Sequence, residues 1–108
     1  MTNEDIRMKI AEIKGWTFVD AKKFIGARDK SGLCAFEECP NWPVNIADAM
    51  GLIIEMQSEP YIQAIQITRV PAIGKRWVMW VGANITETGD TLPMAICLAY
   101  IQWKESQK

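Results

Sequence analysis

The segment from Leu92 to Trp103 is apolar on nearly every side of the helix that it predicts. Thr91 is placed to cap this helix, and Pro93 is tolerated in the first turn, where a backbone N–H needs no helical partner. One side carries Leu92, Ala95, Ile96, Ala99 and Trp103, and Met94, Cys97, Leu98 and Ile101 are spread around the rest. A surface helix needs only one apolar stripe. This helix must therefore be covered on two sides, either by other elements of the chain or by a second subunit.

One domain, spanning residues 1–108, is expected from the length of the chain. Hydrophobic residues make up 49% of the sequence, and the five tryptophans among them supply large apolar side chains for a packed core. Acidic and basic residues number 13 and 12, so the formal net charge is −1. Because that balance offers no field for holding polyanions, neither long nucleic acids nor anionic membrane surfaces are expected as partners.

A cytoplasmic location is expected from the absence of targeting and membrane signals. No stretch approaches the roughly 20 consecutive apolar residues that a membrane-spanning helix needs. The opening MTNEDIRMKI has acidic residues where a signal peptide has a basic and then an apolar run. Cys34, Cys39 and Cys97 are an odd number of cysteines, which in the cytosol is more typical of reduced thiols than of disulfides.

Two further helices are predicted from capping residues and helical spacing. Thr2 and Asp5 form a capping box for a helix from Asn3 to Lys14, and Gly15 ends it. Asn45 can cap a second helix that continues to about Gln57. Its predicted apolar face consists of Ile46, Ala49, Met50, Ile53 and Met56. Gly51 inside this helix lowers helix propensity by up to ~1 kcal/mol relative to alanine, so it is predicted to mark the close approach of another backbone.

Short strands are predicted around the first turn signal of the chain. The pieces 16–19 and 23–27 are apolar or β-branched, and Asp29 to Gly32 predicts a turn before 33–36, so we expect a weak hairpin here. The segment from Glu37 to Val44 contains two prolines and is predicted to be a loop.

Stronger strands are predicted in the second half of the chain, over 61–70 and 76–81, followed by an edge strand over 83–88. Trp77, Met79 and Val81 alternate with Arg76, Val78 and Trp80, so both faces of the middle strand are apolar, which is compatible with a cover on each. The predicted fold class is α+β, with an antiparallel sheet of three to five strands layered with three helices.

Catalysis is not expected, because the sequence contains no histidine, which excludes Ser-His-Asp and Cys-His arrangements and every histidine-containing metal site. Cys34 and Cys39 have no evident partners for a zinc site, and Gly74-Lys75 lacks the rest of a phosphate-binding loop. No metal or cofactor is therefore predicted. The carboxylate pairs Glu37–Glu38 and Glu87–Asp90 remain candidates for acid–base chemistry, although solvated loop charges explain them more simply.

The remaining side chains favour binding, because aromatic groups lie close to cations and amides in the sequence. Aromatic rings stack on bases, and guanidinium groups hold phosphates through two hydrogen bonds. The predicted ligand-binding residues are Trp16, Asn41, Trp42, Arg69, Lys75, Arg76, Trp77, Asn84 and Thr86. Trp42 lies in a loop between prolines and is the favoured functional aromatic, whereas at least one of Trp77 and Trp80 is expected to be plain packing. Arg69 and Arg76 flank a turn, where a solvated hairpin end is the simpler explanation.

Three segments of the chain carry a family resemblance. The first predicted helix ends in KIAEIKGW, the middle of the chain reads NWPVNIADAMGLIIEM, and the last helix lies in TGDTLPMAICLAYIQW. Together they resemble the small phage-encoded proteins grouped as the phage ABA sandwich domain, whereas the region from Val19 to Cys39 departs from the family pattern. The residues that carry the resemblance are Gly15, Trp16, Ile46, Ala47, Pro93, Ala95, Ile96 and Cys97.

The resemblance implies helix, sheet and helix layers, and a phage accessory role in the cytoplasm of an infected bacterium. It suggests a homo-oligomer, a dimer or tetramer, that binds and sequesters a nucleotide immune messenger of the cyclic oligonucleotide or cyclic ADP-ribose type and so counters anti-phage defence. Direct inhibition of a host or defence protein through exposed Met and Trp side chains is the alternative. A hydrolase that uses a carboxylate pair is a third hypothesis.

Overall fold

The computed structural model describes residues 2–27, 37–58, 65–70, 76–82 and 85–106. The predicted turn at 29–32, the piece 33–36 and the start of the strand predicted over 61–70 lie outside the described residues. The same holds for Lys75 and Asn84 of the predicted binding set. In chain order the elements are α1 (Asn3–Ile13), β1 (Thr17–Asp20), β2 (Ile25–Ala27), β3 (Glu37–Glu38), α2 (Ile46–Gln57), β4 (Ile65–Val70), β5 (Arg76–Val81), β6 (Ile85–Gly89) and α3 (Leu92–Ser106).

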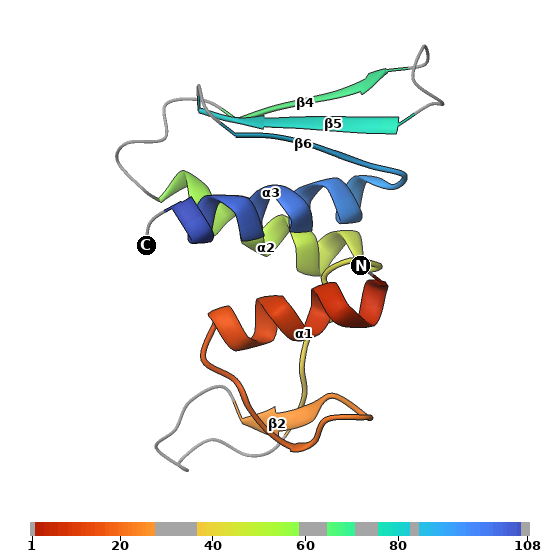
Figure 1. Ribbon diagram of the computed structural model, residues 1–108, viewed down its shortest axis with the longest axis vertical. Helices are drawn as coiled ribbons and strands as arrows, with labels where there is room; N and C mark the ends of the chain where they lie inside the picture. Colours follow the sequence, from red (N-terminus) through yellow and green to blue (C-terminus); the bar gives the residue numbers. More distant parts are fainter. Residues whose placement is uncertain (1, 28–36, 59–64, 71–75, 83–84, 107–108) are drawn as a thin grey trace.

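The predicted α+β class, with three helices layered on antiparallel strands, is confirmed in the described part of the chain. The strands divide between two sheets of three, with orders β1-β2-β3 and β4-β5-β6. Figure 1 shows the layers: the β4-β5-β6 sheet, then α3 with α2, then α1, and finally the β1-β2-β3 sheet. The helices thus lie between two sheets, whereas the family resemblance implied helices on the outside of one sheet.

The helix ends follow the predicted capping residues. Thr2 Oγ1 accepts a hydrogen bond from the backbone N–H of Asp5, and Asp5 Oδ2 accepts one from the backbone N–H of Thr2, so the predicted capping box is present. Gly15 follows α1 with a φ of 87°, a conformation that only glycine adopts without strain. Asn45 Oδ1 accepts from the backbone N–H groups of Ala47 and Asp48 at the start of α2. Local sequence therefore sets these helix boundaries.

The buried face of α2 differs from the predicted one. Ala49, Ile53 and Met56 are buried as expected, but Ile46 and Met50 are exposed and Leu52 takes their place in the core. Because the apolar residues of α2 extend over more than one stripe, periodicity alone could not select the stripe that packs on α3. The prediction for Gly51 is also wrong, since a Cβ built on it would meet no atom within 4 Å.

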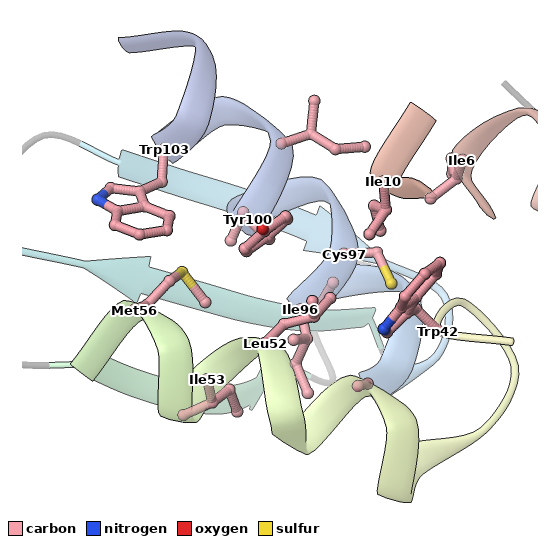
Figure 2. Packing of buried hydrophobic residues seen from close by; sticks show 14 of the residues in the cluster. Ile6, Ile10, Trp42, Leu52, Ile53, Met56, Ile96, Cys97, Tyr100 and Trp103 are labelled. Atoms are coloured by element: carbon pink, nitrogen blue, oxygen red, sulfur yellow. The ribbon is translucent and has the colours of Figure 1, made fainter. Parts of the chain in front are cut away.

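Helix α3 is the central element, and other elements of the same chain cover it on two sides. The β5 and β6 strands pack on one side, and α2 and α1 pack on the other. Figure 2 shows Ile96, Cys97, Tyr100 and Trp103 of this helix in contact range of the core residues from α1 and α2. The first of the two predicted alternatives, burial by the chain itself, is therefore the observed one. Within the described residues, no helix has the length and apolar character needed to span a membrane.

The β4-β5-β6 sheet packs one face on the helices. Trp77, Met79 and Val81 of β5 face the core, with Met79 fully buried. Val78 and Trp80 lie on the opposite face, where no described helix covers them in Figure 1. Val78 is nonetheless buried, because it lies on the middle strand with Thr68 and Thr88 directly opposite on its two neighbours. A second covering layer is therefore not part of the described structure.

Arg7 joins α1 to the segment that the sequence predicted as a loop. Glu37–Glu38 form the short strand β3, a correction to that prediction, and the chain then turns across α1. Arg7 is buried: its Nε donates to Pro40 O at 3.2 Å, and its Nη2 donates to Cys39 O and to Glu38 Oε1. The guanidinium also lies 4.1 Å from the centre of the Phe24 ring. One side chain therefore holds the loop against α1.

Replacing Arg7 by methionine is expected to lower the free energy of unfolding by about 2–4 kcal/mol, because two backbone carbonyls lose their donor. Urea unfolding measures the loss. Lys9→Met is the control on the same helix, since the Lys9–Glu105 ion pair at 3.4 Å lies at the surface and should contribute less than about 1 kcal/mol. Equal losses in the two variants would contradict a special role for Arg7.

Candidate functional site

A groove of about 580 Å³ lies between α1 and α2, with α3 behind it. It forms because α1 and α2 both pack on α3 and pack less on each other. Its volume is in the range of small-molecule sites. We call it the interhelical groove, and its lining residues are Ile13, Lys14, Trp16, Pro40, Trp42, Ala47, Asp48, Gly51, Glu55, Tyr100 and Lys104.

The charges of the groove are balanced between two lysines and two acids. Lys14 Nζ lies 3.7 Å from Glu55 Oε1 and 5.5 Å from the centre of the Tyr100 ring. Asp48 Oδ2 accepts the backbone N–H of Asn41 at 3.0 Å. Among the described residues Lys104 makes no ion pair, and its ammonium lies 4.7 Å from the Trp103 ring. Lys104 is thus the cation that is available to an anionic ligand.

Two buried polar atoms of the groove make no hydrogen bond of ordinary geometry among the described residues. They are Tyr100 Oη and Glu55 Oε2. Burial raises the pKa of the Tyr100 phenol above its ordinary value, and a weak hydrogen-bonding contact with the Glu55 carboxylate, together with its charge, raises it further. The hydroxyl therefore stays protonated and able to donate. Because an unpaired buried polar group costs about 1–3 kcal/mol, this pair is suited to a ligand that can satisfy both atoms.

The predicted binding residues lie in more than one place. Trp16 and Trp42 line the groove, and the Asn41 backbone contacts its Asp48. Both tryptophans are at most 9% exposed, so neither ring offers a free face for stacking. Trp42 belongs to the core, as Figure 2 shows, although its loop position predicted a functional aromatic.

The other predicted residues belong to the β4-β5-β6 sheet, on the far side of α3 from the groove. Arg69 is exposed on β4 opposite Trp77, which packs against the core, and Thr86 is exposed on β6 on the outer face. Arg76 begins β5, and only its backbone is described. The structure therefore does not gather the predicted residues into one site.

Five polar residues of the groove are absent from the binding set predicted from the sequence. They are Lys14, Asp48, Glu55, Tyr100 and Lys104. For two of them the sequence holds a partial indication of a role in the groove. Glu55 follows Gly51 by four residues on α2, and Tyr100 places a hydroxyl within an otherwise apolar helix. Neither indication predicts that the two side chains lie close together, because they belong to different helices whose packing the sequence does not give.

The alternative chemistry proposed from the sequence does not involve the groove. Neither Glu37 and Glu38 nor Glu87 and Asp90 line it, and Glu38 binds Arg7. Burial raises the pKa of Glu87. Burial also raises the pKa of the Cys97 thiol to about 12, so this cysteine is not a thiolate nucleophile. Among the described residues, no group of three or more His, Cys, Asp or Glu side chains could hold a metal ion.

No protein-family model, curated protein or solved structure matches this chain.

Proposed function

We propose that this protein binds a small nucleotide-like ligand in the interhelical groove and does not transform it. The observation that carries the proposal is the unpartnered pair Tyr100 Oη and Glu55 Oε2, buried in a groove that Lys104 also lines. A nucleotide combines the groups that such a groove needs, since its base offers hydrogen-bonding atoms at one edge and its phosphate is an anion.

The side chains present in the groove support the part of the proposal that the ligand is retained without chemistry. The sequence has no histidine, and Tyr100 is held protonated by burial, so it is a poor general base near neutral pH. Glu55 is already engaged by Lys14. These residues suit hydrogen bonding to a ligand better than proton transfer.

In the cell, we propose that this binding sequesters a cyclic oligonucleotide or cyclic ADP-ribose messenger and so counters bacterial anti-phage defence. The support for this role is the sequence resemblance to phage accessory proteins. A homo-oligomer is part of the same proposal, and size-exclusion chromatography with light scattering tests it. Because α3 is covered within the chain, the exposed apolar side chains of α2 are the candidate contact between subunits.

The test is a thermal-shift screen of the purified protein against cyclic dinucleotides, cyclic trinucleotides and cyclic ADP-ribose isomers. A binder should gain several degrees in Tm with one class, because a ligand that binds only the folded state stabilises it. Heat denaturation should then release the ligand intact, as judged by chromatography. A released product would show an enzyme, and no shift with any of these compounds would contradict the nucleotide proposal.

A protein partner is the second candidate, supported by an exposed apolar stripe on α2. Ile46, Met50 and Ile54 follow one another at four-residue spacing, and each is at least 43% exposed. Such a stripe is the kind of surface that helix-mediated contacts use. If it binds a partner, Met50→Glu should abolish capture of that partner in a pull-down from infected cells while leaving the thermal shift with nucleotides unchanged.

A further inference from the structure

Exposed hydrophobic side chains gather on one helix. Five large hydrophobic residues are exposed in the described part of the chain, and only Val19 lies away from α2. The other four are Val44, just before the helix, and Ile46, Met50 and Ile54 on it, with exposed fractions of 43% to 66%. Side chains of this size at these fractions present roughly 400 Å² of mainly apolar surface, a patch size that often marks a contact site. We call this surface the α2 stripe.

The α2 stripe carries no charge, and the exposed residues beside it on the helix are small or neutral. They are Ala47, Gly51 and Gln57. The two acids of the helix lie on the groove side, where Asp48 accepts the Asn41 backbone N–H and Glu55 pairs with Lys14. A charged partner surface would lose its water here without gaining an opposite charge, so the occupant must itself be apolar and uncharged. A second copy of the α2 stripe has both properties.

The spacing of the α2 stripe makes it complementary to itself. Ile46, Met50 and Ile54 are four residues apart, so they follow one another at about 6 Å along the helix, with a β-branched residue on each side of Met50. If two copies of α2 lie antiparallel across a two-fold axis at Met50, each Ile46 faces Ile54 of the other copy and Met50 faces its own symmetry mate. This arrangement also places the positive N-terminal end of each helix beside the negative C-terminal end of the other.

We infer that the protein forms a homodimer in which two α2 helices pack antiparallel through the α2 stripe. The inference names the subunit contact of the proposed homo-oligomer, and it does not depend on which ligand the groove binds. Ala47 and Gly51 line the interhelical groove and border the stripe with little or no side chain, so the partner helix lies beside the open side of the groove. Because the two-fold axis runs perpendicular to both helices, the two grooves open on the same side of the dimer.

The size of the α2 stripe sets the expected affinity. A stable dimer buries about 800 Å² on each partner, and the stripe supplies about half of that area. The expected dimer is therefore weak, with a Kd of about 1–100 µM. Sedimentation of the wild-type protein from about 1 to 500 µM, a range that spans this Kd, should show the 12.2 kDa chain converting to a species of twice that mass. A protein that stays monomeric throughout overturns the inference and leaves the stripe to a different partner.

Ile54→Glu tests whether the dimer forms through the α2 stripe. Ile54 is its most exposed side chain, and a carboxylate there would be buried against an apolar surface, so the Kd should rise at least about tenfold. Val19→Glu is the matched control, because Val19 is 60% exposed on β1, away from α2, and its change should leave the Kd unaltered. Circular dichroism shows whether both variants are folded. An unchanged Kd for Ile54→Glu would place the contact elsewhere and overturn the inference.

Cysteine substitutions test the direction of the paired helices. Met50→Cys should form a disulfide-linked dimer under mild oxidation, since this residue lies beside its symmetry mate. Ile46→Cys alone should not, because its mate lies about 12 Å away along the pair, whereas a mixture of Ile46→Cys and Ile54→Cys proteins should. The wild-type protein controls for the native cysteines. Efficient linking of Ile46→Cys to itself would show parallel helices and overturn the inference.

The thermal-shift screen keeps this inference separate from the proposed nucleotide binding. A protein that dimerises through the α2 stripe but shows no shift with any nucleotide bears out the inference while the nucleotide proposal fails. A monomeric protein that is stabilised by a nucleotide overturns the inference while nucleotide binding stands.

Discussion

Replacing Trp42 by alanine is expected to lower the free energy of unfolding by about 3–5 kcal/mol, a large part of the stability of a domain of this size. Trp42 is only 4% exposed and packs in the core with residues of α1, α2 and α3. Removing the indole leaves an unfilled space between packed helices, which relax into it only in part. Urea unfolding followed by circular dichroism measures the loss.

Trp80→Ala is the matched control for this prediction. Trp80 is half-buried on the outer face of the β4-β5-β6 sheet, between Gln66 and Thr86, so its removal should cost about 1–2 kcal/mol. If the Trp42 variant keeps wild-type stability and loses only ligand binding, the assignment of Trp42 to the core is wrong.

Gly89→Ala is expected to lower the free energy of unfolding by about 2–3 kcal/mol, although the change adds a single methyl group. Gly89 ends β6 where α3 crosses it, and a Cβ at this position would lie 2.6 Å from the backbone nitrogen of Ala95. The clash is with the backbone of the central helix, so no side-chain rotation relieves it. Thermal and urea unfolding both report the change.

The same substitution at Gly51 should change the free energy of unfolding in the opposite direction. No atom lies near the new methyl group and alanine favours the helix, so Gly51→Ala should raise the free energy of unfolding by about 0.5–1 kcal/mol. A stable Gly89→Ala variant would show that β6 and α3 are not packed as closely as the structure indicates.

Features that depend on neighbouring residues were predicted well. The capping box at Thr2, the Asn45 cap and the β5 strand over 76–81 lie where the sequence places them, because each depends on side chains within a few positions. The strand β3 was not predicted, since its two residues carry charged side chains and form a strand only by pairing with β2.

The candidate site was less predictable than the fold. Trp16 and Trp42 do line the groove, but as mostly buried rings. The polar pair that we propose to meet the ligand, Glu55 and Tyr100, is separated by 45 positions in the numbering of the sequence. Each residue alone is ordinary, and their shared position arises from the packing of α2 on α3.

By itself, the sequence determined the class of the fold, the helix ends and the need to bury the last helix on two sides. These follow from composition, capping chemistry and periodicity, which act over a few residues. The tertiary structure decided that the helices lie between two sheets, that α2 exposes Ile46 and Met50, and that Gly51 opens a groove. The reason is physical: which of several apolar stripes is buried depends on the shape of the partner across the core, and that partner is distant in the chain.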